Sequence, residues 1–528
     1  MVSDFLCSLR VLLYNFFAPF FSSGTSLTTS AIKVDDRSTN CTRSRDNGIM
    51  LIDIVSLEWI GLVGLLLHLL GALTAIHAIM TARTSQGAVA WALLLILLPY
   101  VTLPAYAIFG RGKFQGYVKA RRAGDSQIDH IARTLEKKLH LFRVREEDTD
   151  PLYKALDELA ETPFTSHNDA KLLNNGSAAF PAMFAGIEAA TTYVIVQFYI
   201  IRDDKLGRQL KTILVRKARE GVRVYVLFDE IGSYSLPRAY RRELAAAGVI
   251  ILPFRTSRGL RNRFQINFRN HRKILIVDGN IAYVGGLNIG DEYMGRHKTF
   301  GPWRDTMVEV RGPVVQAVQF AFLEDWYWAT GDVPELDWTP LPAPDGNKNA
   351  LCLASDPSDI LETCGLFFMH AINSAKNRIW IATPYFVPDN SLVHALQLAA
   401  IRGVDVRIML PQKADHHLVY FAAFSYIAET ELAGVKFYRY QPGFMHHKML
   451  LVDDELSAVG TANFDNRSIR LNFEIMMLFA DRDFAATVSN VFEQDFAKCR
   501  QATAADVAAQ PFWFHFAVRF ARLLAPVL

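Results

Sequence analysis

The sequence is poor in cysteine and in excess charge. Its five cysteines are scattered among 528 residues without a Cys-x-x-Cys pair, so neither a zinc site nor a disulfide framework is predicted. The formal net charge of +3 at pH 7 is close to balance, so bulk charge points to no particular partner. No cluster of carboxylates suits a divalent metal. We therefore predict that the protein works without a metal and without a cofactor.

Two segments near the N-terminus lack Asp, Glu, Lys and Arg altogether. They span residues 60–80 and 88–109, and a helix crosses the hydrocarbon layer in about 20 residues. A pair of buried core helices is the alternative, but charge-free runs of this length favour membrane spans. We predict a transmembrane helical hairpin over residues 57–112, preceded by a poorly ordered N-terminal extension over residues 1–49.

Basic residues are distributed unequally around this hairpin. The short connection carries only Arg83, whereas five basic residues follow the second run: Arg111, Lys113, Lys119, Arg121 and Arg122. The positive-inside rule then predicts that the large C-terminal part faces the cytoplasm.

Beyond a charged, helical connector predicted for residues 126–161, strand and helix patterns alternate in two matched series. Apolar strands bounded by Gly or Pro and separated by helices indicate βαβ units in both series. The period is too long for a solenoid repeat, which indicates a duplicated domain. We predict an α/β fold of two such domains with mixed, mostly parallel sheets packed face to face. The predicted ranges are residues 162–330 for the first domain, 331–350 for a Pro-rich linker and 351–500 for the second domain.

Each predicted domain contains the same set of polar residues at the same spacing. The first set is His271, Lys273, Asp278 and Asn288, and the second is His446, Lys448, Asp453 and Asn463. Both follow the pattern H-x-K-x4-D, with the Asn seventeen residues after the His. One such pattern is weak, but two at matched places in a repeat make coincidence remote.

The local sequence places each His beside its Lys. Both segments are strand-like, and residues i and i+2 of a strand point to the same face. The following strand returns the Asn to the same edge, and small residues such as Gly285 and Gly460 let an anion approach the backbone.

This combination of residues suits phosphodiester chemistry. One histidine can act as nucleophile and the other as general acid and base. The lysines and asparagines supply positive charge and hydrogen bonds to the phosphoryl oxygens. We expect the two halves to pack so that a single site uses both histidines.

Four carboxylates are candidates for supporting roles. A nucleophilic imidazole is usually oriented through its other nitrogen by a carboxylate, and Asp305 and Glu474 each follow soon after a motif. An ordinary ion pair is the alternative for both. Asp278 and Asp453 are grouped with the catalytic residues, and the alternative is that they are structural turn residues.

These motifs resemble the phospholipase D superfamily, and within it most closely the bacterial cardiolipin synthases. The similarity lies in the paired HxKxxxxD motifs with GGLN and GTAN, the segments PWRDTMVEV and TPYFVPD, and the double apolar N-terminus. It covers roughly residues 55–528.

The resemblance implies that two phosphatidylglycerols give cardiolipin and glycerol at a bacterial inner membrane. By analogy, His271 attacks phosphorus and His446 protonates the leaving glycerol, although the two roles could be reversed. Hydrolysis, another alcohol acceptor and nuclease activity are the alternatives. The membrane hairpin argues against a nuclease, so no nucleic acid partner is expected.

Two further segments are candidates for lipid contact. Residues 257–273 carry six basic residues before the first motif and either attract anionic headgroups or form an ordinary solvated loop. Residues 511–528 are apolar, aromatic and mildly basic. They are predicted to form an amphipathic helix that lies in the membrane interface or packs on the catalytic domain.

Overall fold

The computed structural model describes residues 46–82, 84–110, 114, 117, 126–144, 151–257, 265, 267–297 and 299–525. The predicted N-terminal extension up to residue 45, Arg83 and the basic residues after the second apolar run lie outside this part. The chain divides into two compact units, which are described separately: residues up to 79 with 89–103, and residues 80–88 with 104–528.

The first unit is helical and apolar. Its helices are α2 (Asp46–Thr81), α3 (Ser85–Leu97) and the start of α4 (Pro99–Phe109). Within the described residues, one helix is long and apolar enough to cross a membrane, over Gly61–Thr81. Gly71 lets α2 approach α3 closely, because a Cβ there would lie 2.3 Å from the backbone oxygen of Leu95.

The second apolar run departs from the prediction of one continuous span. It forms two shorter helices that separate at Leu98, because Pro99 has no N–H and its ring clashes with a preceding helical turn. The Thr102 hydroxyl donates a hydrogen bond of 2.8 Å to the Leu98 carbonyl beside this break. A hairpin of two uninterrupted spans is therefore corrected to one long helix followed by two short ones.

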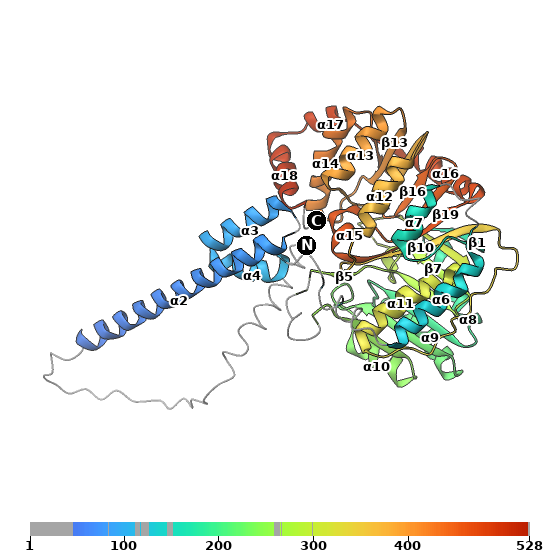
Figure 1. Cartoon of the computed structure of the whole chain (residues 1–528), viewed down its shortest axis with the longest axis horizontal. Coiled ribbons are helices and arrows are strands. Elements are labelled where there is room, and N and C mark those ends of the chain that lie inside the picture. The colour runs from blue at the N-terminus through green and yellow to red at the C-terminus, as the bar shows by residue number, and fades with distance from the viewer. Residues whose placement is uncertain are drawn as a thin grey trace. The chain divides into compact units, whose positions relative to one another are not determined.

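The second unit contains both copies of the repeat, as Figure 1 shows. It opens with α6 (Ser126–Leu139), η1 (His140–Phe142) and α7 (Pro151–Ala160), in the stretch predicted as a helical connector. The first copy comprises β1 (Thr165–Asn174), α8 (Asn175–Ala189), β2 (Tyr193–Phe198), α9 (Lys205–Arg219), β3 (Arg223–Asp229), α10 (Arg238–Ala246), β4 (Ile250–Phe254), β5 (Arg269–Asn270), β6 (Ile274–Val277), β7 (Ile281–Gly285), η4 (Asp291–Met294), β8 (Trp303–Arg304), β9 (Thr306–Arg311) and α11 (Val314–Thr330).

The second copy repeats this order after the Pro-rich stretch. It comprises β10 (Lys348–Ser355), α12 (Thr363–Ser374), β11 (Arg378–Ala382), β12 (Phe386–Val387), α13 (Asn390–Ile401), β13 (Asp405–Pro411), α14 (His417–Glu431), β14 (Lys436–Tyr440), β15 (Phe444–Met445), β16 (Met449–Val452), β17 (Leu456–Gly460), β18 (Phe464–Asp465), α15 (Asn466–Arg470), β19 (Asn472–Ala480), α16 (Arg482–Phe496) and β20 (Cys499–Ala502). Two helices follow, α17 (Ala504–Ala508) and α18 (Phe512–Leu523).

The strands of the two copies have the same order. In the first copy it is β1-β9-β7-β6-β2-β3-β4, and in the second β10-β19-β17-β16-β11-β13-β14, with β20 added at the edge. In each copy three strands are parallel and the others antiparallel, so both sheets are mixed. Asp204 and Asp389 cap the matched helices α9 and α13 by accepting hydrogen bonds from backbone N–H groups. These features confirm the predicted duplicated α/β fold with mixed sheets. The expectation that the sheets are mostly parallel is wrong, because most strand pairs in both copies are antiparallel.

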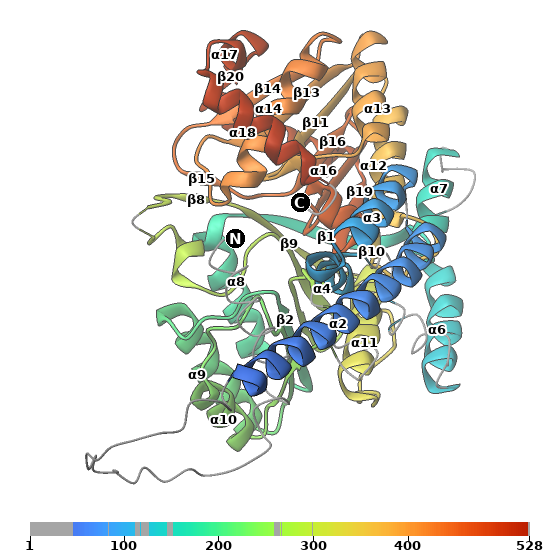
Figure 2. The same ribbon diagram turned by 90° about the vertical axis from the view of Figure 1, so that its left-hand side faces the viewer.

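Two of the contacts that join the copies involve the main sheets. Strand β1 pairs with β9 of its own copy and with β10 of the other, so the two sheets are continuous (Figure 2). The inner faces also share one hydrophobic cluster, in which Ile195 and Ile276 of the first copy lie with Leu451 and Ile475 of the second. The two copies therefore pack against each other as predicted. Strand β1 connects the edges of their sheets, although its polar sequence did not predict a strand.

The C-terminal helix α18 has two different faces. Phe514, Val518 and Ala521 are buried, and the Phe514 ring packs against Phe421 and Phe424 of α14. Five large apolar side chains on the remaining surface are 51–84% exposed: Phe512, Trp513, Phe516, Phe520 and Leu523. The helix therefore packs on the second unit, as one alternative predicted, and presents an apolar surface on its other side; contact with the membrane interface stays a prediction.

Candidate active site

Each of the two histidines predicted to be catalytic pairs with a carboxylate from the opposite copy. His271 Nδ1 lies 3.0 and 2.9 Å from the two carboxylate oxygens of Glu474. His446 Nδ1 lies 2.9 Å from Oδ2 of Asp305. All four side chains are buried. The two acids named from the sequence therefore lie where orienting carboxylates are needed, but each contacts the histidine of the other motif.

Short strands between the copies set up this exchange. β5 runs parallel to the start of β19, pairing Asn270 with Phe473, so the next residues, His271 and Glu474, lie side by side. In the same way β15 pairs with β8, which brings His446 beside Asp305. Backbone hydrogen bonds continue the pairing, from the N–H of His271 to Phe473 and from the N–H of His446 to Arg304. The crossing is therefore fixed by main-chain pairing and not by side-chain contacts alone.

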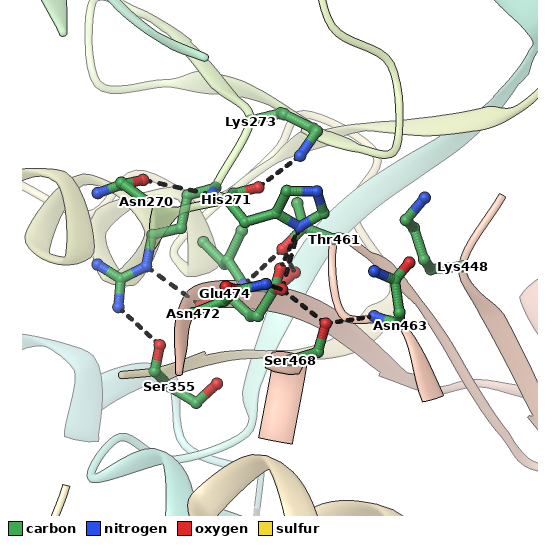
Figure 3. A network of polar contacts seen from close by, with 12 residues as sticks. Asn270, His271, Lys273, Ser355, Lys448, Thr461, Asn463, Ser468, Asn472 and Glu474 are labelled. Atoms are coloured by element: carbon green, nitrogen blue, oxygen red, sulfur yellow. Dashed lines mark hydrogen bonds and ion pairs between the residues drawn. The ribbon is translucent and has the colours of Figure 1, made fainter. Parts of the chain in front are cut away.

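The lysines of the two motifs interact with the same charged side chains. Lys273 Nζ donates to the backbone oxygen of His271 at 2.6 Å, and Lys448 Nζ lies 3.1 Å from Nε2 of His446. Glu474 acts electrostatically on both lysines, and Lys448 acts on His271. Figure 3 shows Lys273, Lys448 and the imidazole of His271 in this network. The copies thus contribute to one polar site.

Burial controls the protonation of these groups. It lowers the pKa of both histidines to about 4, so the imidazoles are neutral near pH 7. Burial likewise lowers the pKa of Lys273 to about 7 and that of Lys448 to about 8. For Glu474, burial raises the pKa, but the nearby His271 and Lys273 outweigh it and leave the carboxylate ionised. A neutral imidazole that donates Nδ1–H to a carboxylate keeps the Nε2 lone pair available for attack.

The two asparagines differ in their contacts. Asn288 accepts a hydrogen bond from the Ile200 N–H and donates one to the Tyr293 hydroxyl, so its amide helps to hold the loop. Asn463 is buried, and its Oδ1 has no partner among the described residues. Binding of phosphoryl oxygens by these two residues stays a prediction, and Asn463 has the freer amide.

Asp278 and Asp453 lie at the opposite ends of β6 and β16 from the histidines. Asp278 accepts hydrogen bonds from the backbone and hydroxyls of Thr191 and Thr192 and from the N–H of Tyr193. Asp453 accepts three backbone N–H groups of residues 376–378. Both have a positive φ of about 50°, which Asp tolerates in turns. These contacts favour the alternative of structural turn residues, because both carboxylates hold the start of the neighbouring strand, and a catalytic role stays a prediction.

Several supporting residues carry no sequence signal of their own. The Ser468 hydroxyl and the Asn472 amide donate to Glu474 at 2.8 and 3.0 Å, and Trp303 Nε1 donates to Asp305 at 3.2 Å. The rings of Tyr199 and Tyr385 lie edge-on to His271 and His446. The position of these tyrosines after matched strands of the repeat is the one signal that could have identified them.

The basic segment before the first motif is only partly described. Arg258, Arg261 and Arg263 lie outside the described residues. Arg272 is buried in an ion pair of 2.9 Å with Asp325, and Lys273 is buried in the active site. The prediction that all six basic residues form a lipid-attracting or solvated loop is therefore wrong for these two.

This duplicated fold, with one polar site built from paired histidines and lysines, defines a phosphatidyltransferase of the phospholipase D type. A family profile described as "Cardiolipin synthase, PLD-like domain" matches residues 183–326 and 368–496. One described as "Phospholipase_D-nuclease N-terminal" matches residues 69–111. The chain belongs to the cardiolipin synthase family.

Individual relatives agree with this assignment. Cardiolipin synthase A of Pseudomonas putida is 48% identical over 470 residues, which cover 88% of this chain and 97% of the relative. The protein of the same name from Pseudomonas fluorescens is 46% identical over 466 residues, with the same coverage. A crystal structure of phosphatidylserine synthase from Haemophilus influenzae superposes with a TM-score of 0.55 at 14% identity. It covers 72% of this chain and 100% of that one, so it supports the fold. With the apolar helix α2, the family match indicates association with a membrane.

Proposed function

We propose that the protein transfers a phosphatidyl group from one phosphatidylglycerol to another, giving cardiolipin and glycerol. The observation that carries this proposal is the exchanged pairing of His271 with Glu474 and of His446 with Asp305. It supplies two oriented imidazoles to one site, as a two-step exchange of phosphodiesters requires.

In the first step, Nε2 of His271 attacks phosphorus, and the bond from phosphorus to the glycerol oxygen breaks. His446 gives a proton to the departing alkoxide, so glycerol leaves neutral and phosphatidyl-histidine remains. The negative phosphodiester opposes the effect of burial on His446 and raises its pKa, so that it can hold this proton. Lys273 and Lys448 stabilise the charge on the phosphoryl oxygens.

In the second step, the acceptor hydroxyl attacks phosphorus and the bond from phosphorus to His271 breaks. His446 takes the hydroxyl proton and is ready for the next cycle. One phosphodiester replaces another, so no nucleotide is needed. His271 is the better candidate for nucleophile, because both oxygens of Glu474 hold its Nδ1, whereas Lys448 lies beside both ring nitrogens of His446.

Product analysis tests the proposal directly. The full-length protein is placed in vesicles of phosphatidylglycerol, with phosphatidylethanolamine present as a competing acceptor, and products are measured by mass spectrometry. We expect cardiolipin and glycerol in equal amounts. Phosphatidic acid without cardiolipin would identify a hydrolase, and a phosphatidylethanolamine adduct would identify a different acceptor. The His271→Ala protein is the matched negative control.

We further propose that the protein lies in the bacterial inner membrane, with the catalytic unit facing the cytoplasm and α18 touching the bilayer. The sequence asymmetry of basic residues supports the orientation. The exposed aromatic surface of α18, which also carries the exposed Arg519, suits the interface of an anionic bilayer. Protease access to a C-terminal tag in spheroplasts and in inverted vesicles tests the orientation, which requires cleavage in the inverted vesicles alone.

A further inference from the structure

A polar recess lies next to the active site in the second copy. It is small and opens to solvent at its mouth. Its lining includes Tyr385, Lys413, Asp415, His416, Tyr420 and Arg439. The mechanism above uses none of these residues. Three of the six side chains are basic and one is acidic, so the recess suits an anion that also carries a hydroxyl group.

Arg439 in this recess is a buried cation without a carboxylate partner among the described residues. The residue is only 2% exposed, and its Nη2 has no hydrogen-bond partner there. The rings of Tyr420 and Phe424 each lie 4.7 Å from the guanidinium, and this packing stabilises its face. The Tyr420 side chain also hydrogen-bonds to the guanidinium, but Nη2 itself has no partner among the described residues. Nη2 is therefore left to bind an oxygen of a ligand.

The surrounding charges also favour an anion. Arg500 on the neighbouring strand acts on Arg439 as a second cation, but it already pairs with Asp506 at 2.9 Å. Asp415, the carboxylate of the recess, accepts a hydrogen bond from the Tyr385 hydroxyl. Lys413 is exposed at the rim and contacts the backbone oxygen of Thr299. Arg439 and Lys413 both line the recess and are its two permanent cations.

The buried cation of the recess has no counterpart in the first copy. Arg439 pairs with Leu410, the residue before the last of β13, and the matched position in the first copy is Pro253, which pairs with Phe228 of β3. The first copy thus has no cation at this place. A reaction between two lipids needs different binding environments for the donor and for the acceptor. The cation that is present in the second copy and absent from the first provides such a difference.

Tyr385 connects the recess to the reacting groups. Its ring forms part of the lining and lies 6.4 Å from the ring of His446, between centroids. The same tyrosine lies 5.8 Å from the ring of His416 inside the recess. A headgroup whose phosphate is held by Arg439 therefore has one side chain between it and the general base.

We propose that this recess is the binding site for the phosphodiester of the acceptor lipid. Arg439 and Lys413 bind the phosphate oxygens, and Asp415 accepts a hydrogen bond from the headgroup. The three-carbon glycerol headgroup extends past Tyr385, so that its terminal hydroxyl reaches His446. This inference rests on the proposed function and adds where the second lipid binds.

Two reactions of the same full-length enzyme separate this site from the catalytic one. Transfer to phosphatidylglycerol needs an acceptor phosphate, whereas exchange of labelled free glycerol into phosphatidylglycerol needs the histidines and the donor lipid alone. We expect Arg439→Gln to lower cardiolipin synthesis in vesicles about ten- to hundredfold and to leave glycerol exchange within about twofold. Arg439→Lys is expected to recover part of the loss, because it keeps the charge.

Controls make the outcomes distinct. Arg407→Gln changes an arginine that also packs on aromatic rings but pairs with Asp405 and does not line the recess, and it is expected to leave the ratio of the two reactions unchanged. Lys413→Glu, at an exposed position, should lower lipid transfer several-fold without affecting exchange, even if Arg439→Gln fails to fold.

Three results would overturn the inference. In the first, both reactions fall together in the folded Arg439→Gln protein. In the second, neither Arg439→Gln nor Lys413→Glu lowers lipid transfer. In the third, Arg439→Gln removes inhibition by inorganic phosphate but leaves lipid transfer intact, which would assign the recess to free phosphate. If the proposed function itself were wrong, the unmodified enzyme would make no cardiolipin. That result is distinct from the three results that would overturn the inference about the recess.

Discussion

His271 and Glu474 are 203 residues apart in the sequence, and their side chains meet at 2.9 Å across the junction of the two copies. The reciprocal contact joins His446 to Asp305 at the same distance. Neither copy alone contains an imidazole with its orienting carboxylate. The duplication is therefore required for the chemistry itself and not only for a larger binding surface.

The exchanged pairing predicts which half-reaction each acid supports. Asp305→Asn weakens the orientation of His446, which is the acid of the first step and the base of the second, so phosphatidyl-His271 should form slowly and then persist, because attack by the acceptor is slowed as well. Glu474→Gln weakens His271, so no covalent intermediate should accumulate. Both variants should lose roughly 10²- to 10⁴-fold in turnover. Peptide mass spectrometry after rapid quenching measures the adduct, and accumulation in Glu474→Gln instead would mean that each acid serves the histidine of its own motif.

The lowered pKa values of the lysines predict the alkaline limit of activity. Lys273, with a pKa of about 7, and Lys448, with a pKa of about 8, lose their protons as pH rises through this range, which removes positive charge from the phosphate site. We therefore expect kcat/KM for a short-chain phosphatidylglycerol to fall above about pH 7 to 8. At the acid end it should fall as His271 becomes protonated near pH 4. A profile that stays flat to pH 10 would contradict the effect of burial on both lysines.

Sequence reasoning identified the repeat and its polar residues because their chemistry is encoded by local spacing. The i and i+2 positions of His and Lys on a strand-like segment place both at one site without further information. The partners of the histidines were not predictable in this way. The pairing of β5 with β19 joins residues about 200 positions apart, and no local pattern distinguishes it from pairing within one copy.

Other differences have equally specific causes. Strand β1 is rich in polar residues, including Asp169 and Lys171, and most of its residues are exposed or only partly buried, so it lacks the apolar run that is typical of a buried strand. The break at Leu98 depends on Pro99, because a proline interrupts a helix locally even where the surrounding run is apolar enough to span a membrane. The recess around Arg439 depends on loops whose positions the sequence pattern does not define.

Asp278 should matter for stability and not for the chemical step. Its carboxylate accepts five hydrogen bonds at the start of β2, away from the histidines. We expect Asp278→Ala to reduce the free energy of unfolding by about 2 kcal/mol and to leave turnover per folded molecule within a few-fold of the original. Thermal unfolding and active-site titration measure the two quantities. A large loss of turnover with unchanged thermal stability would return Asp278 to the catalytic residues, and Asp453→Ala tests the matched position.

The apolar surface of α18 should matter only when the substrate is in a bilayer. Phe516 and Phe520 are exposed on this helix, so replacing both with Asp leaves the buried contact of Phe514 with α14 intact. We expect the double variant to lose about tenfold or more in activity on phosphatidylglycerol vesicles, since two aromatic contacts with the bilayer are lost and two negative charges face an anionic interface. Activity on a short-chain substrate below its critical micelle concentration should be unchanged, because the active site is unaltered. Leu432→Asp is the matched control, as Leu432 is 91% exposed on a different element at the end of α14. Equal losses on both substrates would mean that α18 stabilises the catalytic unit and does not contact lipid.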